Sequence, residues 1–320
     1  MALLEIKGLK THFKTDDGWL HAVDGVDISI ERGQTVCVVG ESGCGKTVTA
    51  MTVLKLLPMP PGKIVAGQVL WQGKDLVTAS SDEMRRVRAK EIAIIFQEPM
   101  TSLNPVYSIG EQIAESLRLH DGLSRKAAME RAVEMLALVR IPTPQQRVHE
   151  YPHQFSGGMR QRVAIAIALL NSPDVIIADE PTTALDVTIQ GQILYEMQRL
   201  TRETGTALVW ITHDLSVIAG LADRVSVMYA GRIVEEGTVE EVLSRPRHPY
   251  TRGLIDSVPS NNVRGARLKQ IPGMTPSLLD LPPGCAFRER CARAEPDCLQ
   301  SPPMLAMSPT GHAARCLHPL

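Results

Sequence analysis

The sequence has few aromatic residues, almost no net charge and no long apolar run. Phe, Trp and Tyr make up 4% of its 320 residues, which is too few to suggest a base-stacking surface. Lys and Arg number 34 against 35 Asp and Glu, and the formal net charge of -1 indicates neither a basic field nor an acidic tail. We therefore do not expect the chain to bind nucleic acid.

The longest unbroken apolar stretch, residues 163–170, falls well short of the roughly 18–20 residues that span a bilayer. Glu5 and Lys7 stand where a secretory leader would be apolar, so a cytosolic protein is expected. With 44% hydrophobic residues the chain can bury a substantial core, and its length favours about two domains.

Short apolar runs alternate with helix-length segments along most of the chain. Residues 35–39 (TVCVV) read as a strand buried on both faces, because the run is continuous and ends in a glycine-rich turn. Other predicted strands span residues 3–13, 20–30, 91–97, 175–178 and 207–211, and helical patterns span 108–140 and 187–202. This alternation predicts an α/β fold with a parallel sheet covered by helices.

Proline becomes frequent toward the C-terminus. Twelve of the 22 prolines lie in residues 246–320, where long regular helices are therefore not expected. We place a boundary near residue 245, with an α/β domain over residues 1–245 and a loop-rich extension over 246–320.

A glycine-rich loop follows the strand at 35–39. Its sequence GESGCGKT fits the pattern G-x-x-x-x-G-K-[ST], and it precedes a helical segment, as a phosphate-binding loop must. Glycines let backbone N–H groups point at phosphate oxygens, the lysine supplies a charge, and the threonine hydroxyl is a magnesium ligand. The predicted phosphate-binding residues are Gly40, Glu41, Ser42, Gly43, Cys44, Gly45, Lys46 and Thr47.

Two adjacent carboxylates end the apolar strand at 175–178. We expect Asp179 to hold magnesium and Glu180, pointing the other way by strand alternation, to accept a proton from an attacking water. Solvated acids at a strand end are the simpler explanation in isolation, but not in a chain that also carries a phosphate loop.

The segment FSGGMRQR, about twenty residues before Asp179, resembles the signature motif LSGGQ of ATP-binding-cassette ATPases. The resemblance covers residues 1–245 and implies a RecA-like core, an N-terminal antiparallel β-subdomain and a helical subdomain at about 98–160. It also implies an ATPase that uses ATP and Mg²⁺. By this resemblance Gln97 is the glutamine-loop residue and a magnesium ligand, Asp186 ends the D-loop, His213 is the switch histidine, and Phe13 stacks on adenine.

The signature turn is expected to bind the ATP held by a partner subunit, as in the family it resembles. Residues Ser156, Gly157 and Gly158 precede a helix predicted to begin near Met159, and N–H groups at a helix start attract anions. Met159 stands in place of the usual glutamine and Phe155 in place of leucine. The change at Met159 removes a polar contact but leaves the anion site, so we expect hydrolysis to persist.

The segments QEPMTSLNP and HPYTRGLIDSVP make the chain similar to the peptide/nickel importer branch, and most of all to dipeptide and oligopeptide transport ATPases. This implies a peripheral subunit at the cytoplasmic face of the membrane. Its partners would be a second, homologous ATPase in a heterodimer, two permeases contacting residues 98–105, and indirectly an extracytoplasmic binding protein. Nickel or another solute is the alternative cargo, and a soluble ATPase acting on nucleic acid or ribosomes is the alternative class.

Four of the six cysteines cluster near the C-terminus, with five, six and seventeen residues between them. Such thiols in a reducing compartment suggest a metal site. The short C-x₂₋₄-C pairs typical of zinc are missing, which favours an iron–sulfur cluster, and some dipeptide-transport ATPases with a similar tail carry [4Fe–4S]. We predict that the cluster is bound by Cys285, Cys291, Cys298 and Cys316, and the alternatives are zinc or thiols that are unligated or form disulfides.

Overall fold

A computed structural model describes residues 2–97, 102–182, 185–259, 262, 269–300, 305–308 and 311–320. The chain divides into two compact units, which are described separately. The first comprises Met1–Thr78 and Ile211–Leu320, and the second comprises Ala79–Trp210. None of the described helices is long and apolar enough to cross a membrane.

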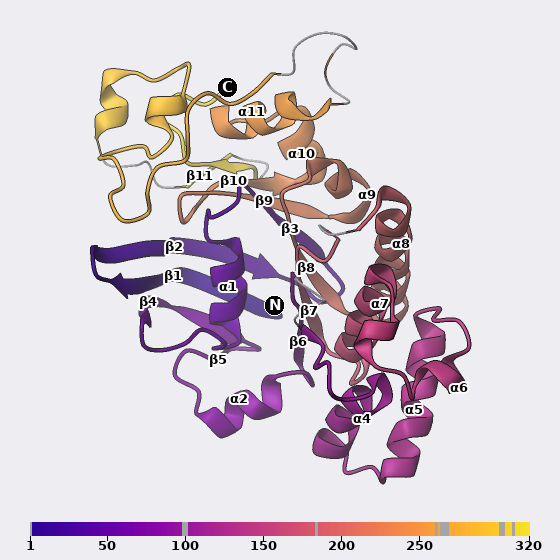
Figure 1. The fold of residues 1–320 in the computed structure, drawn as a ribbon. Coiled ribbons are helices and arrows are strands. Elements are labelled where there is room, and N and C mark those ends of the chain that lie inside the picture. The colour runs from indigo at the N-terminus through magenta and orange to yellow at the C-terminus, as the bar shows by residue number, and fades with distance from the viewer. Residues whose placement is uncertain are drawn as a thin grey trace. The chain divides into compact units, whose positions relative to one another are not determined.

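The first unit opens with an antiparallel sheet of strand order β2-β1-β4-β5 (Figure 1). Alternation predicts one buried face, and Val26, Ile28 and Ile30 of β2 are indeed buried. The sheet confirms the expected N-terminal antiparallel subdomain. Its strands are β1 (Leu4–Thr15), β2 (Gly18–Ile30), β4 (Gly62–Trp71) and β5 (Lys74–Asp75).

A second set of strands in this unit begins with β3 (Thr35–Val39), the apolar run before the phosphate loop. It pairs in parallel with β9 (Arg224–Tyr229), which pairs antiparallel with β10 (Arg232–Thr238). Beyond β10 the order continues through β12 (Ala313–Ala314) to β11 (Ala306–Met307), so the end of the chain adds strands to this sheet.

Short helices complete the first unit. Eight-residue α1 follows the phosphate loop, and α11 contains most of the HPYTRGLIDSVP segment. The elements are α1 (Lys46–Val53), η2 (Leu215–Val217), α9 (Ile218–Leu221), α10 (Val239–Ser244), α11 (Pro249–Ser257), η4 (Arg288–Arg290) and η5 (Pro296–Leu299).

The second unit combines parallel strands with most of the long helices. Strand β6 (Ile92–Ile95) pairs in parallel with β7 (Val175–Asp179), and β8 (Ala207–Thr212), which begins in this unit, is next to β7 in the strand order. The helices are α2 (Ser81–Val87), α4 (Ile109–His120), α5 (Arg125–Leu138), α6 (Pro144–Arg147), η1 (Pro152–Gln154), α7 (Gly157–Leu169) and α8 (Val187–Thr204).

The helical pattern predicted at 108–140 is two helices rather than one. Ser108 and Ser124 each cap a helix through the side-chain oxygen, and Gly122 has a φ of 66° in the turn between them. The spacing-four residues Ile109, Ile113 and Leu117 all lie on the buried face of α4, as predicted.

Candidate nucleotide and cysteine sites

The phosphate loop joins the buried strand β3 to α1 in the first unit. Gly45, which precedes α1, has a φ of 106°, and a Cβ there would collide with the carbonyl oxygen of Ala22. A Cβ at Gly40 would likewise collide with the carbonyl oxygen of Met228. Both positions therefore require glycine, because the loop is pressed against neighbouring backbone.

The start of α1 has the properties of an anion site. No side chain caps it, and no acidic residue lies in its first turn. The buried ammonium of Lys46 donates to the carbonyls of Gly40 (2.9 Å) and Glu41 (3.0 Å), and so lies over the loop. Thr47, at the second helical position, is half-buried.

Two other expected nucleotide residues belong to the same unit. Phe13 is half-buried in β1 opposite Gly62, where a Cβ would come within 3.2 Å of its ring. His213 is exposed and follows β8 directly. Their roles toward adenine and the γ-phosphate remain predictions.

In the second unit, the structure brings Gln97 and Glu180 together. The Gln97 amide Nε2 donates to the Glu180 carboxylate Oε2 at 3.2 Å. Asp179 ends the fully buried strand β7, and Glu180 is also buried. A glutamine and a buried carboxylate thus meet at a strand end, where a water could be oriented and deprotonated.

Strand alternation, which we expected to orient Glu180, does not determine its direction. Glu180 lies outside β7 and has a φ of 45°, in the left-handed region that side chains rarely adopt. The strand has already ended, so its period of two no longer applies. A strained, buried carboxylate is typical of functional sites.

The signature turn begins α7 two residues earlier than predicted, since the helix starts at Gly157 rather than near Met159. Ser156 is the N-cap, and its hydroxyl accepts the N–H of Met159 at 3.3 Å. One first-turn N–H is therefore already satisfied within the chain.

The two signature glycines differ in their surroundings. A Cβ at Gly158 would come within 2.9 Å of Ile189 Cγ2 in α8, whereas the described residue nearest to a Cβ at Gly157 is Leu185, at 3.9 Å. Asp186 caps α8 by accepting the N–H of Ile189 at 3.0 Å, so the end of the D-loop lies near the turn. Ala184 of the D-loop and residues 98–101 of the predicted docking segment lie outside the described residues.

Cys285, Cys291, Cys298 and Cys316 line one small cavity, and none forms a disulfide. Burial raises the pKa of Cys285, Cys291 and Cys316, and the neighbouring thiols raise it further. Backbone N–H groups two residues further on, at Phe287, Arg293 and His318, oppose this by donating to the sulfurs. The Arg293 N–H lies 3.4 Å from the sulfur of Cys291.

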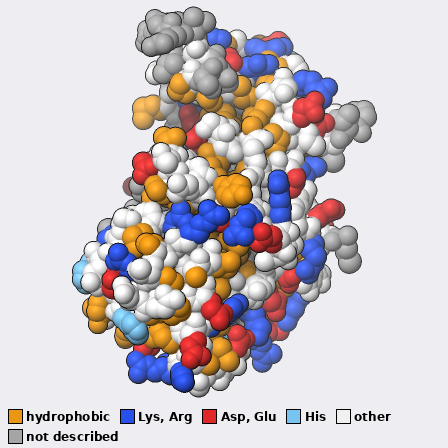
Figure 2. All heavy atoms as spheres, turned by 90° about the vertical axis from the view of Figure 1, so that its right-hand side faces the viewer, with side chains coloured by type: hydrophobic (Ala, Val, Ile, Leu, Met, Phe, Trp, Pro, Cys, Tyr) orange, Lys and Arg blue, Asp and Glu red, His pale blue; other side chains and the backbone are white. Residues whose placement is uncertain are grey.

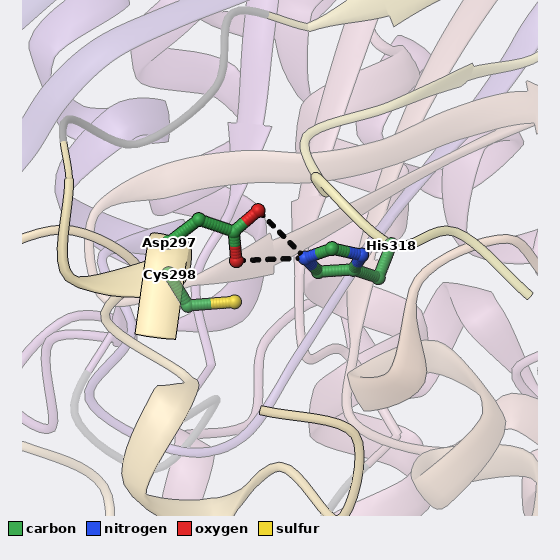
Figure 3. A group of neighbouring side chains, drawn as sticks. All are labelled: Asp297, Cys298 and His318. Atoms are coloured by element: carbon green, nitrogen blue, oxygen red, sulfur yellow. Dashed lines mark hydrogen bonds and ion pairs between the residues drawn. The ribbon is translucent and has the colours of Figure 1, made fainter. Parts of the chain in front are cut away.

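A second candidate ligand group shares Cys298 (Figure 3). His318 Nε2 lies 2.8 Å and 2.9 Å from the two carboxylate oxygens of Asp297, and this hydrogen bond raises the pKa of His318 and lowers that of Asp297. Among the described residues, the ligand atoms found within 4.8 Å of one another are those of Asp297, Cys298 and His318.

Two residues of the extension that were not predicted from the sequence contact the phosphate loop. Tyr250 and Arg290 both bond Glu41, from 209 and 249 positions away. No local sequence signal could have revealed contacts at such separations.

Comparison with known proteins decides the family. A profile described as ABC transporter matches residues 23–183, which is half of the chain and contains the phosphate loop, the signature turn and Glu180. The chain belongs to the ATP-binding cassette family. A second profile, "Oligopeptide/dipeptide transporter, C-terminal region", matches residues 234–298.

Similarity to individual cassette proteins extends over nearly the whole chain. The oligopeptide transport ATP-binding protein OppD of Bacillus subtilis is 52% identical, covering 99% of this chain and 89% of that protein. The dipeptide transport ATP-binding protein DppD of the same organism is 46% identical, covering 98% and 94%.

Solved cassette structures agree with the fold. A dimeric cassette in a post-hydrolysis state, bound to ADP and phosphate, matches with a TM-score of 0.66 and 28% identity, covering 74% of this chain and 98% of that one. The predicted α/β cassette fold and ATPase activity are therefore confirmed at the level of the family.

Proposed function

We propose that this chain is the ATP-hydrolysing motor subunit of a peptide importer. The observation that carries the proposal is the joining, in one chain, of a cassette site to an extension matching the oligopeptide/dipeptide transporter profile. Identity near 50% to peptide-transport ATPases over almost the full length supports it. Such a motor works at the cytoplasmic face of a membrane.

Within this proposal, residues 40–47 bind the phosphates, and Thr47, Asp179 and Gln97 are the expected Mg²⁺ ligands. Glu180 is the general base, His213 reports the γ-phosphate, and Phe13 packs on adenine. The contact between Gln97 and Glu180 supports a shared water-activating role. A base placed in this way contributes roughly 10²–10⁴-fold to a rate.

The proposed partner ATPase is a second, homologous subunit in a heterodimer. Its ATP would be bound by Ser156, Gly157, Gly158 and Met159, with Asp186 nearby. The surroundings of Gly157 support this assignment, because a Cβ there would make only an ordinary contact, with Leu185 at 3.9 Å, among the described residues.

A groove of about 810 Å³ in the second unit suits a permease segment. Val106 and Tyr107 are 72% and 57% exposed at its edge, and the groove also contains Met129 and Val133. Glu130 and Lys126 add charges of both signs. An amphipathic helix with an apolar face is the occupant that we propose, adjacent in sequence to residues 98–105. The extracytoplasmic binding protein would act through the permeases.

We also propose that the extension carries a [4Fe–4S] cluster on its four cysteines. The four half-buried cysteines line one cavity, and an iron cluster would balance the charge of their thiolates and cross-link the loops. Thiolates around zinc stand about 3.8 Å apart, given Zn–S distances of about 2.3 Å. The tightest ligand group contains only Cys298 of the four, which favours the larger cluster.

Metal analysis of anaerobically purified protein distinguishes the cluster from zinc. Iron with absorbance near 400 nm, lost in Cys291→Ser but kept in His318→Ala, supports the cluster. Zinc that is lost in His318→Ala places the metal at Asp297, Cys298 and His318 instead. Protein with neither metal contradicts both assignments.

Co-purification of the full chain tests the motor function. Recovery of two permeases and a second cassette ATPase, with ATP hydrolysis stimulated by peptide-loaded binding protein, is expected. Stimulation by nickel-loaded binding protein instead would change the cargo. Recovery of RNA, DNA or ribosomes would replace the proposal by a soluble ATPase, although acidic and basic side chains lie among one another on the face shown in Figure 2.

A further inference from the structure

Glu41 of the phosphate loop is held by the C-terminal extension. Its backbone N–H donates to the Tyr250 hydroxyl at 2.9 Å. Its carboxylate accepts two bonds from the Arg290 guanidinium, at 2.6 Å from Nη1 to Oε2 and 2.9 Å from Nη2 to Oε1. This bidentate pairing fixes direction as well as distance.

Neither contact is a loose surface pair. The Arg290 side chain is 5% exposed, and its Nε donates to the carbonyl of Pro272 at 2.9 Å. Tyr250 is fully buried, with its ring 4.6 Å from that of Tyr229 and 5.4 Å from that of Phe287. The Arg290 donor and the Tyr250 acceptor are therefore both held in place by their own surroundings.

The same loop residue is also bound from the nucleotide side. Lys46 Nζ, the cation expected on the phosphates, donates to the Glu41 carbonyl at 3.0 Å. The N–H, the carbonyl and the carboxylate of Glu41 are thus held by three different residues. A shift of the extension would move the loop whose N–H groups are expected to receive phosphate.

We propose that Arg290 and Tyr250 are positioning residues of the ATPase reaction, through which the C-terminal extension sets the nucleotide affinity of the phosphate loop. Arg290 also cancels the Glu41 carboxylate, which would otherwise repel a triphosphate. Because both residues act on binding rather than on water activation, they affect KM more than kcat.

The test measures the Kd of a fluorescent ATP analogue with Mg²⁺, together with KM and kcat, on the full chain. Arg290→Gln is expected to raise Kd about tenfold, or about 1.4 kcal/mol, with kcat changed less than threefold. Arg290→Lys keeps the positive charge but not the bidentate pairing with Glu41, so its Kd should lie between those of the wild type and Arg290→Gln. Arg252→Gln, an exposed arginine of α11, is the matched control and should match wild type.

A double-mutant cycle with Glu41→Gln locates the effect. If Arg290 acts through Glu41, the double variant binds no more weakly than Arg290→Gln alone. Additive losses, a twofold or smaller effect of Arg290→Gln, or an equal loss in Arg252→Gln would each overturn the inference.

Tyr250→Phe keeps the test decisive if Arg290→Gln does not fold. It retains the buried ring and removes one hydroxyl, so Kd should rise about threefold to fivefold. An unchanged Kd would refute the role of Tyr250.

The inference rests on the proposed phosphate role of residues 40–47, which Lys46→Ala tests separately. If Lys46→Ala does not weaken binding, the phosphate site itself is wrong. If Lys46→Ala does so while Arg290→Gln and Tyr250→Phe do not, only the positioning role fails.

Discussion

Gly157→Ala in the signature turn is expected to keep or raise the stability of the fold while weakening ATP-dependent association with the partner ATPase. Gly157 is the first residue of α7, and among the described residues a methyl group there would meet only Leu185, at an ordinary contact distance of 3.9 Å. Alanine is favoured over glycine in a helix by roughly 0.5–1 kcal/mol, a value that is an upper limit for the first turn. Gly157→Ala should therefore leave the free energy of unfolding unchanged or raise it by up to about 1 kcal/mol.

The same methyl group would occupy space that we assign to the partner's ATP. Crowding of a close contact costs roughly 1–3 kcal/mol, so ATP-dependent association with the partner ATPase should weaken at least about fivefold. Light scattering in a Glu180→Gln background, with and without ATP, measures this association. Denaturant unfolding supplies the stability.

Gly158→Ala is the comparison variant for the stability measurement. Its Cβ would lie 2.9 Å from Ile189 Cγ2, so it should destabilise the fold by about 1–3 kcal/mol through crowding against α8. If Gly157→Ala associates with the partner ATPase as strongly as the wild type, the assignment of the turn to a partner's nucleotide is refuted. A large loss of stability in Gly157→Ala would refute the packing argument.

Three further predictions follow from the described contacts. Glu180→Gln should keep ATP affinity and lose at least about 100-fold in turnover, measured by phosphate release, and rapid turnover would remove Glu180 from the base role. Although burial raises the pKa of Asp24, its bonds to Lys10 and Arg232 lower it to about 2, below the ordinary value of 3.8. Ionised Asp24 therefore adds about 2 kcal/mol to the free energy of unfolding above pH 4, and this contribution is lost as the pH falls toward 2. In Asp24→Asn, the free energy of unfolding should not show this loss between about pH 4 and 2. The Phe287 side chain is 4% exposed, so Phe287→Ala should leave a cavity and lower the free energy of unfolding by roughly 3–5 kcal/mol, measured by denaturant. A decrease below about 1 kcal/mol would contradict an anchoring role for Phe287.

Local patterns were sufficient to predict the elements on which the nucleotide site is built. The run at 35–39 and the run before Asp179 are apolar throughout, and both form buried strands. The phosphate loop follows from glycines that the backbone requires at Gly40 and Gly45. These features depend on residues that are close in sequence, so a single sequence is enough to locate them.

Orientation and long-range pairing could not be predicted in this way. The left-handed backbone at Glu180 leaves no mark in a sequence of ordinary residues, so strand alternation gave the wrong reason for its direction. The extension was expected to be a loop-rich module, yet Ala313 and Ala314 pair with β10, and Tyr250 and Arg290 reach the phosphate loop. Which loop contacts which strand is decided by three-dimensional packing.

The buried carboxylate of Glu235 explains how so short an extension can hold Arg290 firmly. It accepts the N–H groups of Arg247 and His248, at 2.6 Å and 2.8 Å, and lies 2.7 Å from the ring of His312. These partners come from both ends of the extension and converge on one fully buried side chain of β10. Removing any one of them leaves a buried carboxyl group with a hydrogen bond unmade, which is costly, so docking of one end of the extension favours docking of the other. An extension that docks cooperatively moves as one unit, so a displacement of the extension also displaces Arg290. A positioning role for Arg290 requires this rigidity.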